Sequence, residues 1–171
     1  MKHLFTITIL CFLYCSLTLS QAPDTIWTKV YGDGDYERGN SIVITDDNGF
    51  AIVGAADALY SGGNLTEGDI WLVRTNSTGD TLWTKTYGGS GIDEGNSIYQ
   101  TADGGFILAG ARSNNLLIYD AWLIRTDSNG DTIWTKTYGE NLGEELASSV
   151  IETSDSGFAF TGFRNTQTTF S

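Results

Sequence analysis

The feature that most constrains this chain is one pattern that occurs three times. The stretch DTIWTKVYG recurs as DTLWTKTYG and DTIWTKTYG, so that Trp27, Trp83 and Trp134 stand 56 and 51 residues apart. A second block, NSIVITDDNGFAIVGA, recurs as NSIYQTADGGFILAGA and SSVIETSDSGFAFTGF, and a third, DIWLVRTNSTG, recurs once as DAWLIRTDSNG. Self-similarity at a period of about 20 to 50 residues is typical of stacked supersecondary units. The predicted units span about 24–79, 80–130 and a truncated 131–171.

Each unit is predicted to contain four β-strands. In the middle copy, segments 97–101 and 106–110 are joined by TADGG, in which Asp and Gly favour the positive φ values of a tight hairpin. Segments 120–126 and 131–138 are joined by DSNG, which we interpret as a hairpin turn rather than a calcium loop or an aspartate box. Successive apolar positions in 106–110 predict a strand covered on both faces, whereas alternation in 131–138 predicts a half-exposed outer strand.

Repeated four-stranded antiparallel units predict an all-β fold of the β-propeller type. With 21 Gly and a single Pro, the composition is that of a turn-rich β protein. The ring is incomplete, because fewer than three blades are present and closed propellers typically have about 4 to 8. A β-sandwich or a β-solenoid is the alternative, although a sandwich needs no repeat. The tryptophans expected to be structural are Trp27, Trp83, Trp134, Trp71 and Trp122.

Residues 1–22 have the layout of a cleaved secretory signal. Lys2 precedes an apolar run, and small residues follow near a cleavage point at 20–22. A membrane anchor is the alternative, but the run is interrupted by Thr and Ser and is shorter than the roughly 20 apolar residues of a spanning helix. The sequence therefore predicts a secreted or cell-surface protein whose mature part, 23–171, is a partial β-propeller.

The mature chain offers few groups for catalysis. Cys11, Cys15 and His3, which are all the cysteines and histidines, lie in the predicted signal peptide. Without them there is no thiol, disulfide or imidazole, which argues against most hydrolase mechanisms and against Cys or His metal sites. A formal net charge of −12 argues against nucleic acid and anionic membrane surfaces as partners.

Two stretches resemble known repeats. The run WTKTYGGSGIDEGNSIYQTADGGFILAG, followed by DAWLIRTDSNG, resembles the bacterial β-propeller repeat called SBBP, which is common in large secreted and surface proteins of Bacteroidetes-type bacteria. The piece RTDSNGDTIW is similar to the tryptophan-docking repeat of quinoprotein-like propellers, with Asp127, Gly130 and Trp134 in the matching places. The resemblance covers nearly all of 24–163. It implies a propeller with a mainly structural repeat and says little about chemistry.

Acidic residues gather in the loops that precede the second block. In a meander the connections alternate between two rims, so the loops GDGDYERG, GGSGIDEG and GENLGEEL share one rim with the variable loop ADALYSGGNLTEG. Carboxylates interleaved with Gly are ligands that Ca²⁺ accepts. A solvated face that keeps the protein soluble is the simpler interpretation, because no loop follows the full calcium-loop pattern. The candidate Ca²⁺ ligands are Asp33, Asp35, Glu37, Asp93, Glu94, Glu140, Glu144 and Glu145.

Two functional classes remain open at this point. We expect a non-enzymatic module for extracellular binding or display, whose partner is a glycan, a protein or a cation, because acids that recur with a repeat are usually scaffold. The alternative is the N-terminal part of a propeller enzyme, glycosidase or quinoprotein-like, with catalytic residues outside this chain. The unfinished third unit indicates an N-terminal fragment that joins further blades of a longer chain. A short chain that covers its open edges by self-association is the alternative.

Overall fold

The computed structural model describes five stretches of the chain, and these are all-β. They are residues 26–32, 36–61, 64–113, 118–139 and 143–166. The predicted signal peptide therefore lies outside the described residues. Within the described stretches there are ten strands and no helix, and so no helix that is long and apolar enough to cross a membrane.

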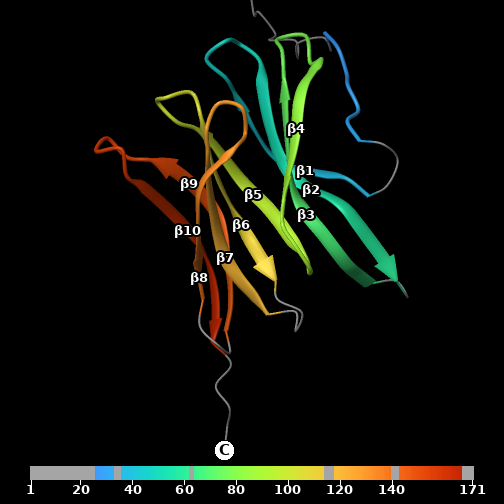
Figure 1. Ribbon diagram of the computed structural model, residues 1–171, viewed down its shortest axis with the longest axis vertical. Coiled ribbons are helices and arrows are strands. Elements are labelled where there is room, and N and C mark those ends of the chain that lie inside the picture. Colours follow the sequence, from blue (N-terminus) through green and yellow to red (C-terminus); the bar gives the residue numbers. More distant parts are fainter. Residues whose placement is uncertain (1–25, 33–35, 62–63, 114–117, 140–142, 167–171) are drawn as a thin grey trace, which may run out of the picture.

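The ten strands form three antiparallel sheets that follow one another along the chain (Figure 1). The first sheet contains β1 (Arg38–Ile44), β2 (Phe50–Ser61), β3 (Asn64–Thr75) and β4 (Thr81–Tyr87). The second sheet contains β5 (Asp93–Gln100), β6 (Phe106–Ser113), β7 (Tyr119–Thr126) and β8 (Thr132–Tyr138). The third sheet contains β9 (Gly143–Glu152) and β10 (Phe158–Thr166).

The first two sheets have the same strand order and matching registers. Each is a meander, β1-β2-β3-β4 and β5-β6-β7-β8. Phe50 pairs with Thr75 in the first sheet, and Phe106 pairs with Thr126 at the equivalent place in the second. The four-stranded units predicted from the sequence are therefore present as hydrogen-bonded sheets in both places.

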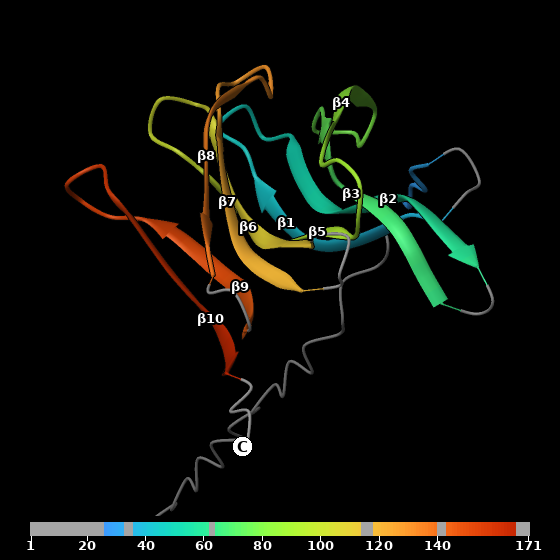
Figure 2. The same cartoon turned by 60° about the horizontal axis from the view of Figure 1, so that its bottom comes forward.

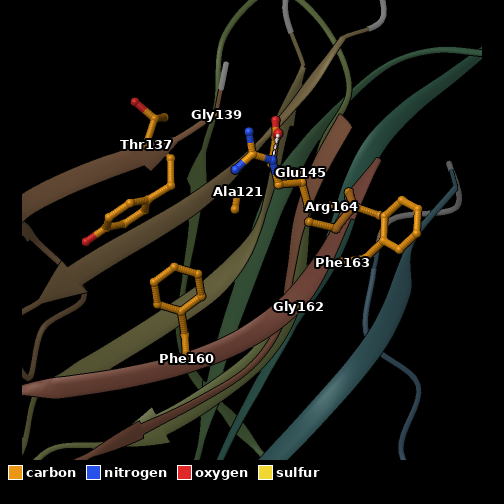
Figure 3. Close-up of a pocket in the computed structure, with 10 residues that line it drawn as sticks. Ala121, Thr137, Gly139, Glu145, Phe160, Gly162, Phe163 and Arg164 are labelled. Atoms are coloured by element: carbon orange, nitrogen blue, oxygen red, sulfur yellow. Dashed lines mark ion pairs between the residues drawn. The ribbon is translucent and has the colours of Figure 1, made fainter. Parts of the chain in front are cut away.

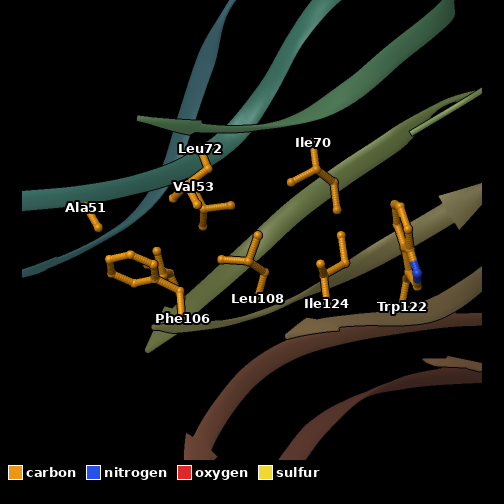
Figure 4. Packing of buried hydrophobic residues seen from close by; sticks show 9 residues of the cluster. Ala51, Val53, Ile70, Leu72, Phe106, Leu108, Trp122 and Ile124 are labelled. Atoms are coloured by element: carbon orange, nitrogen blue, oxygen red, sulfur yellow. The ribbon is translucent and has the colours of Figure 1, made fainter. Parts of the chain in front are cut away.

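The second sheet is the centre of the core because it packs against a sheet on each side (Figure 2). Phe106 and Leu108 of β6 face the first sheet, where Val53, Ile70 and their neighbours meet them (Figure 4). The intervening residues of β6 belong to a separate cluster against the third sheet. The strand alternates between two apolar clusters, as the prediction for 106–110 required, and its side chains up to Ala111 are all buried.

Two expectations about local structure were wrong. The segment ADALYSGGNLTEG, expected to be a long loop, is mostly an extension of β2 and β3, whose backbones stay paired as far as Ser61 and Asn64. The first copy of the tryptophan block, expected to be a strand, is irregular over residues 26–31. A strand needs a hydrogen-bonded neighbour, and no described strand pairs with this segment.

Candidate functional site

The recurring outer-strand residues join neighbouring sheets. Trp83 of β4 packs edge-on against Phe106 of the second sheet, with ring centroids 6.2 Å apart. The Lys85 ammonium lies 2.8 Å from the Asp131 carboxylate, and the Tyr87 hydroxyl donates to a backbone carbonyl of the β7–β8 turn at 2.6 Å. Burial raises the pKa of Tyr87, so this phenol stays protonated and keeps donating. We call this arrangement the sheet junction.

The same junction occurs one unit earlier, between residues 26–31 and the first sheet. Trp27 packs on Phe50 with centroids 5.7 Å apart, and Lys29 pairs with Asp80 at 2.7 Å. Tyr31 donates to the Gly79 carbonyl at 2.9 Å. Trp27 and Trp83 therefore each pack against a phenylalanine of the sheet that follows them.

The two third-strand tryptophans differ from each other. Trp122 is 4% exposed and belongs to the core between the first and second sheets, whereas Trp71 of the first sheet is half-buried and lies outside that core. The Trp122 ring also lies beneath the Arg112 guanidinium, 4.9 Å from its centroid. Trp122 is therefore part of the core, whereas the structural role expected for Trp71 stays a prediction.

In each of the first two sheets, a buried arginine fastens the β-turn between the first and second strands. Arg125 of β7 is bidentate to Asp103, with Nη2 2.6 Å from both carboxylate oxygens. Hydrogen bonds from Thr101 and Arg125 lower the pKa of Asp103 to about 2. Arg74 and Asp47 repeat the pair in the first sheet. These acids are structural at neutral pH because they are ionised and paired.

The structure places five of the eight candidate calcium ligands. Asp33, Asp35 and Glu140 lie outside the described residues. Four of the others were expected in loops, but the strands begin earlier than predicted: Asp93 and Glu94 belong to β5, and Glu144 and Glu145 belong to β9. The fifth, Glu37, directly precedes β1. The acidic rim is therefore built largely from strand ends.

Asp93 is held inside the protein. Its side chain is 1% exposed, and its two carboxylate oxygens accept hydrogen bonds from the backbone amides of Ser113 and Gly89, at 3.2 and 3.1 Å. Desolvation raises the pKa of Asp93 to about 6, and nearby Asp69 adds to this effect, while Arg112 opposes it. An acid so placed anchors the strand end through these two hydrogen bonds.

Two of the other rim acids, Glu94 and Glu145, have cationic partners. Glu94 accepts from Arg38 at 2.5 Å and from the Asn40 amide at 3.0 Å, which ties the first sheet to the second. Glu145 is 8% exposed and lies 3.4 Å from the Arg164 guanidinium of β10. Among the described residues, no group of three or more acidic side chains is arranged to hold a metal ion. The calcium site stays a prediction.

Sequence reasoning missed a cavity between the second and third sheets. It has a volume of about 520 Å³ and lies against β8, β9 and β10, and the Glu145–Arg164 pair, Phe160 and Phe163 are among the residues that line it (Figure 3). A neighbouring cavity of about 490 Å³ continues along β8 past Trp134. No sequence signal marks these cavities, because they arise where β10 has no outer neighbour among the described strands.

Comparisons with known proteins add no identification. A scan against protein-family models finds no match, and no curated protein matches the sequence.

Proposed function

We propose that this chain is a secreted, non-enzymatic β-propeller-type repeat module that serves extracellular binding or display. The observation that carries the proposal is the use made of the recurring polar and aromatic residues. At both junctions they bind one another, in pairs such as Lys85–Asp131 between the first two sheets and Lys29–Asp80 between residues 26–31 and the first sheet. Residues committed to such contacts build a scaffold and are not free for chemistry.

The fate of the strongest acid–base candidate also supports a non-enzymatic role. A general acid with a pKa near neutrality has the right titration range for catalysis, and the pKa of Asp93 is raised to about 6. However, it must also touch the reacting atom, and Asp93 is enclosed with its oxygens bound to backbone amides. We therefore assign the exposed rim residues to binding rather than to catalysis.

The strand arrangement supports the finer assignment to a propeller. Two four-stranded meanders pack face to face in chain order, and a third sheet begins in the same way. The inner strand β6 is buried on both faces while β4 and β8 are half-exposed, which is the burial gradient that a blade has. Secretion is supported by the signal-like residues 1–22.

A paired assay of binding and turnover tests this proposal. We expect the full chain to bind at least one member of an extracellular glycan or protein array, and to turn over none of a panel of glycosides and peptides. The rim variant Glu144→Gln is expected to weaken binding at the acidic rim. The control variant Asp46→Asn removes the same charge on the opposite rim and should leave that binding unchanged. Clear substrate turnover by the chain would instead favour the propeller-enzyme alternative.

A further inference from the structure

The groove between β8 and the outer edge of β10 is open, although the equivalent grooves in the structure are filled. We call it the β8–β10 groove; its residues are Trp134, Lys136, Tyr138, Phe158 and Phe160. Both cavities described above lie along it. Trp134 still meets Phe158, with centroids 5.8 Å apart, and Tyr138 meets Phe160 at 5.0 Å. The two sides of the groove, β8 and β10, are therefore already in contact through these aromatic rings.

The preceding groove, between β4 and β6, shows what such a groove accepts. It is filled by the β7–β8 hairpin, because β7 pairs with β6 and the hairpin turn receives the side chains of β4. The β3–β4 hairpin does the same along β2 and residues 26–31. Two independent examples within one chain thus have the same occupant, a β-hairpin.

Each of these hairpins makes two charged contacts at a fixed spacing. In the β7–β8 hairpin, Arg125 binds Asp103 and Asp131 binds Lys85. The arginine and the aspartate are six residues apart in the sequence RTDSNGD, and the β3–β4 hairpin has the same spacing in RTNSTGD. With this sequence spacing, the arginine reaches the turn aspartate of its own sheet, and the aspartate reaches the outer-strand lysine of the sheet before it.

The β8–β10 groove presents the same two receptors. Asp155 is oriented as Asp103 is, since it accepts from Thr153 at 2.5 Å and from the Gly157 amide at 3.2 Å. Neither Asp155 nor Lys136 has an ion-pair partner among the described residues, and the Lys136 ammonium instead lies 5.7 Å from the Tyr138 ring.

The apolar lining is also ready for a partner. Phe160 is 37% exposed and Phe163 is 52% exposed, whereas the residue equivalent to Phe160 in β6, Leu108, is fully buried. The outer edge of β10 pairs with no described strand, and a strand edge of this kind is a template for the backbone of another strand.

We propose that the β8–β10 groove binds a polypeptide β-hairpin that has an arginine and an aspartate six residues apart across an Asn/Asp-Ser-x-Gly turn. The hairpin's arginine binds Asp155, its aspartate binds Lys136, and its turn carbonyl accepts from the Tyr138 hydroxyl. Its first strand extends the third sheet, with the threonine that follows the arginine opposite Phe158. The inference rests on the proposed scaffold function and names the partner of the scaffold's open end.

A synthetic hairpin provides the test. The probe is a peptide with the sequence of residues 119–138, cyclised through its ends because an isolated hairpin is only marginally stable. Titration into the isotope-labelled full chain, followed by NMR and calorimetry, is expected to show saturable binding. The amide shifts should concentrate on β10 and on β8.

Matched variants identify the two ion pairs. We expect Asp155→Asn in the protein and Arg125→Ala in the peptide each to weaken binding about tenfold, and the two together to weaken it no further. Lys136→Ala and peptide Asp131→Ala should behave as a second such pair. Asp46→Asn in the protein is the control that leaves affinity unchanged. Asp155 and Lys136 are exposed, so an unfolding curve should show that these variants keep their fold.

Three results would overturn the proposal. They are no binding at millimolar peptide, equal binding of a peptide that lacks both charges, and a dimer in which a second copy of the chain covers β10. Failure of peptide binding while the rim still binds its ligand rejects the hairpin alone. Turnover of a substrate rejects the scaffold function, whatever the peptide does.

Discussion

The second sheet has a boundary with the first sheet and another with the third, and both are built from the same residue types. The boundary with the first sheet is filled by a hairpin, and we call it the finished boundary; the boundary with the third sheet is open. At the boundary with the first sheet, Lys85 meets Asp131 and the groove beside β4 is filled. At the boundary with the third sheet, Lys136 and Tyr138 have no turn to bind within the described residues, and cavities remain. The difference teaches that a hairpin of the following sheet, rather than the outer strand itself, completes each junction.

The largest expected effect concerns two equivalent phenylalanines. Phe106 is 1% exposed between the first two sheets, so Phe106→Ala should lower the free energy of unfolding by about 3 to 5 kcal/mol. Phe158 is only half-buried beside the open groove, so Phe158→Ala should cost less than half as much. Urea unfolding of both variants measures the contrast. Equal losses would mean that the open boundary is packed as tightly as the finished one.

Comparing alanine substitutions at two turn glycines separates the cost of backbone strain from the cost of disturbing the contact between the turn and the neighbouring sheet. Gly130 and Gly104 both have positive φ, 79° and 83°, so an alanine at either position costs about 1 kcal/mol or more for the backbone alone. At Gly130 an added Cβ would also lie 2.8 Å from the Trp83 ring, whereas at Gly104 the nearest atom is 4.0 Å away. We expect Gly130→Ala to be the more destabilising by about 1 to 2 kcal/mol. Similar thermal shifts for both variants would contradict a tight junction.

The buried carboxyl at the finished boundary predicts a pH dependence. The pKa of Asp93 is raised from 3.8 to about 6, so the folded state binds the proton more tightly than the unfolded chain does. Stability contributed by this group is therefore greatest below pH 4 and falls as the pH rises to about 6, by at most about 1.4 kcal/mol per pH unit.

The Asp93→Asn variant isolates this contribution. It should be more stable than the parent at pH 7 and should approach it near pH 4, as measured by urea unfolding at several pH values. Asp46→Asn, a surface change at the other rim, is the reference. A constant difference between Asp93→Asn and the parent across this pH range would show that Asp93 titrates normally.

The smallest contrast concerns two tyrosine hydroxyls. Tyr87 donates to the Gly130 carbonyl at the finished boundary, so Tyr87→Phe should cost about 1 kcal/mol. Tyr138 has no turn carbonyl to bind among the described residues, and Tyr138→Phe should be neutral within error. In the presence of the hairpin peptide, Tyr138→Phe should weaken peptide binding, which would make the two boundaries alike.

Much of the strand content could be predicted from the sequence because its signals are local. Alternation along 131–138 and the apolar run 106–110 reflect burial on one or two faces, and the Asp and Gly of the turns reflect φ preferences. The irregular segment 26–31 was missed for the opposite reason. It has the same sequence pattern as β4 and β8, but strand pairing depends on a neighbour that the pattern cannot supply.

The candidate site was less predictable because burial of an acid is decided by other sheets. Asp93 and Glu145 have the composition of a solvated loop around them, and only packing against the neighbouring sheet encloses them. The cavities beside β8 likewise depend on which strand lies next to β10. The burial of these acids and the cavities depend on contacts between sheets, and the sequence pattern of a single unit does not predict such contacts.

The sheet junction has a direction: in both examples the lysine and the tyrosine come from the upstream segment, and the aspartate and the turn carbonyl come from the downstream sheet. Each four-stranded sheet therefore has both halves of the contact in its last hairpin, the acceptor half in the turn and the donor half in the outer strand. A tandem duplication or deletion of one whole unit in the gene would leave every remaining junction matched. Such a chain can change its length over evolutionary time without any compensating substitution.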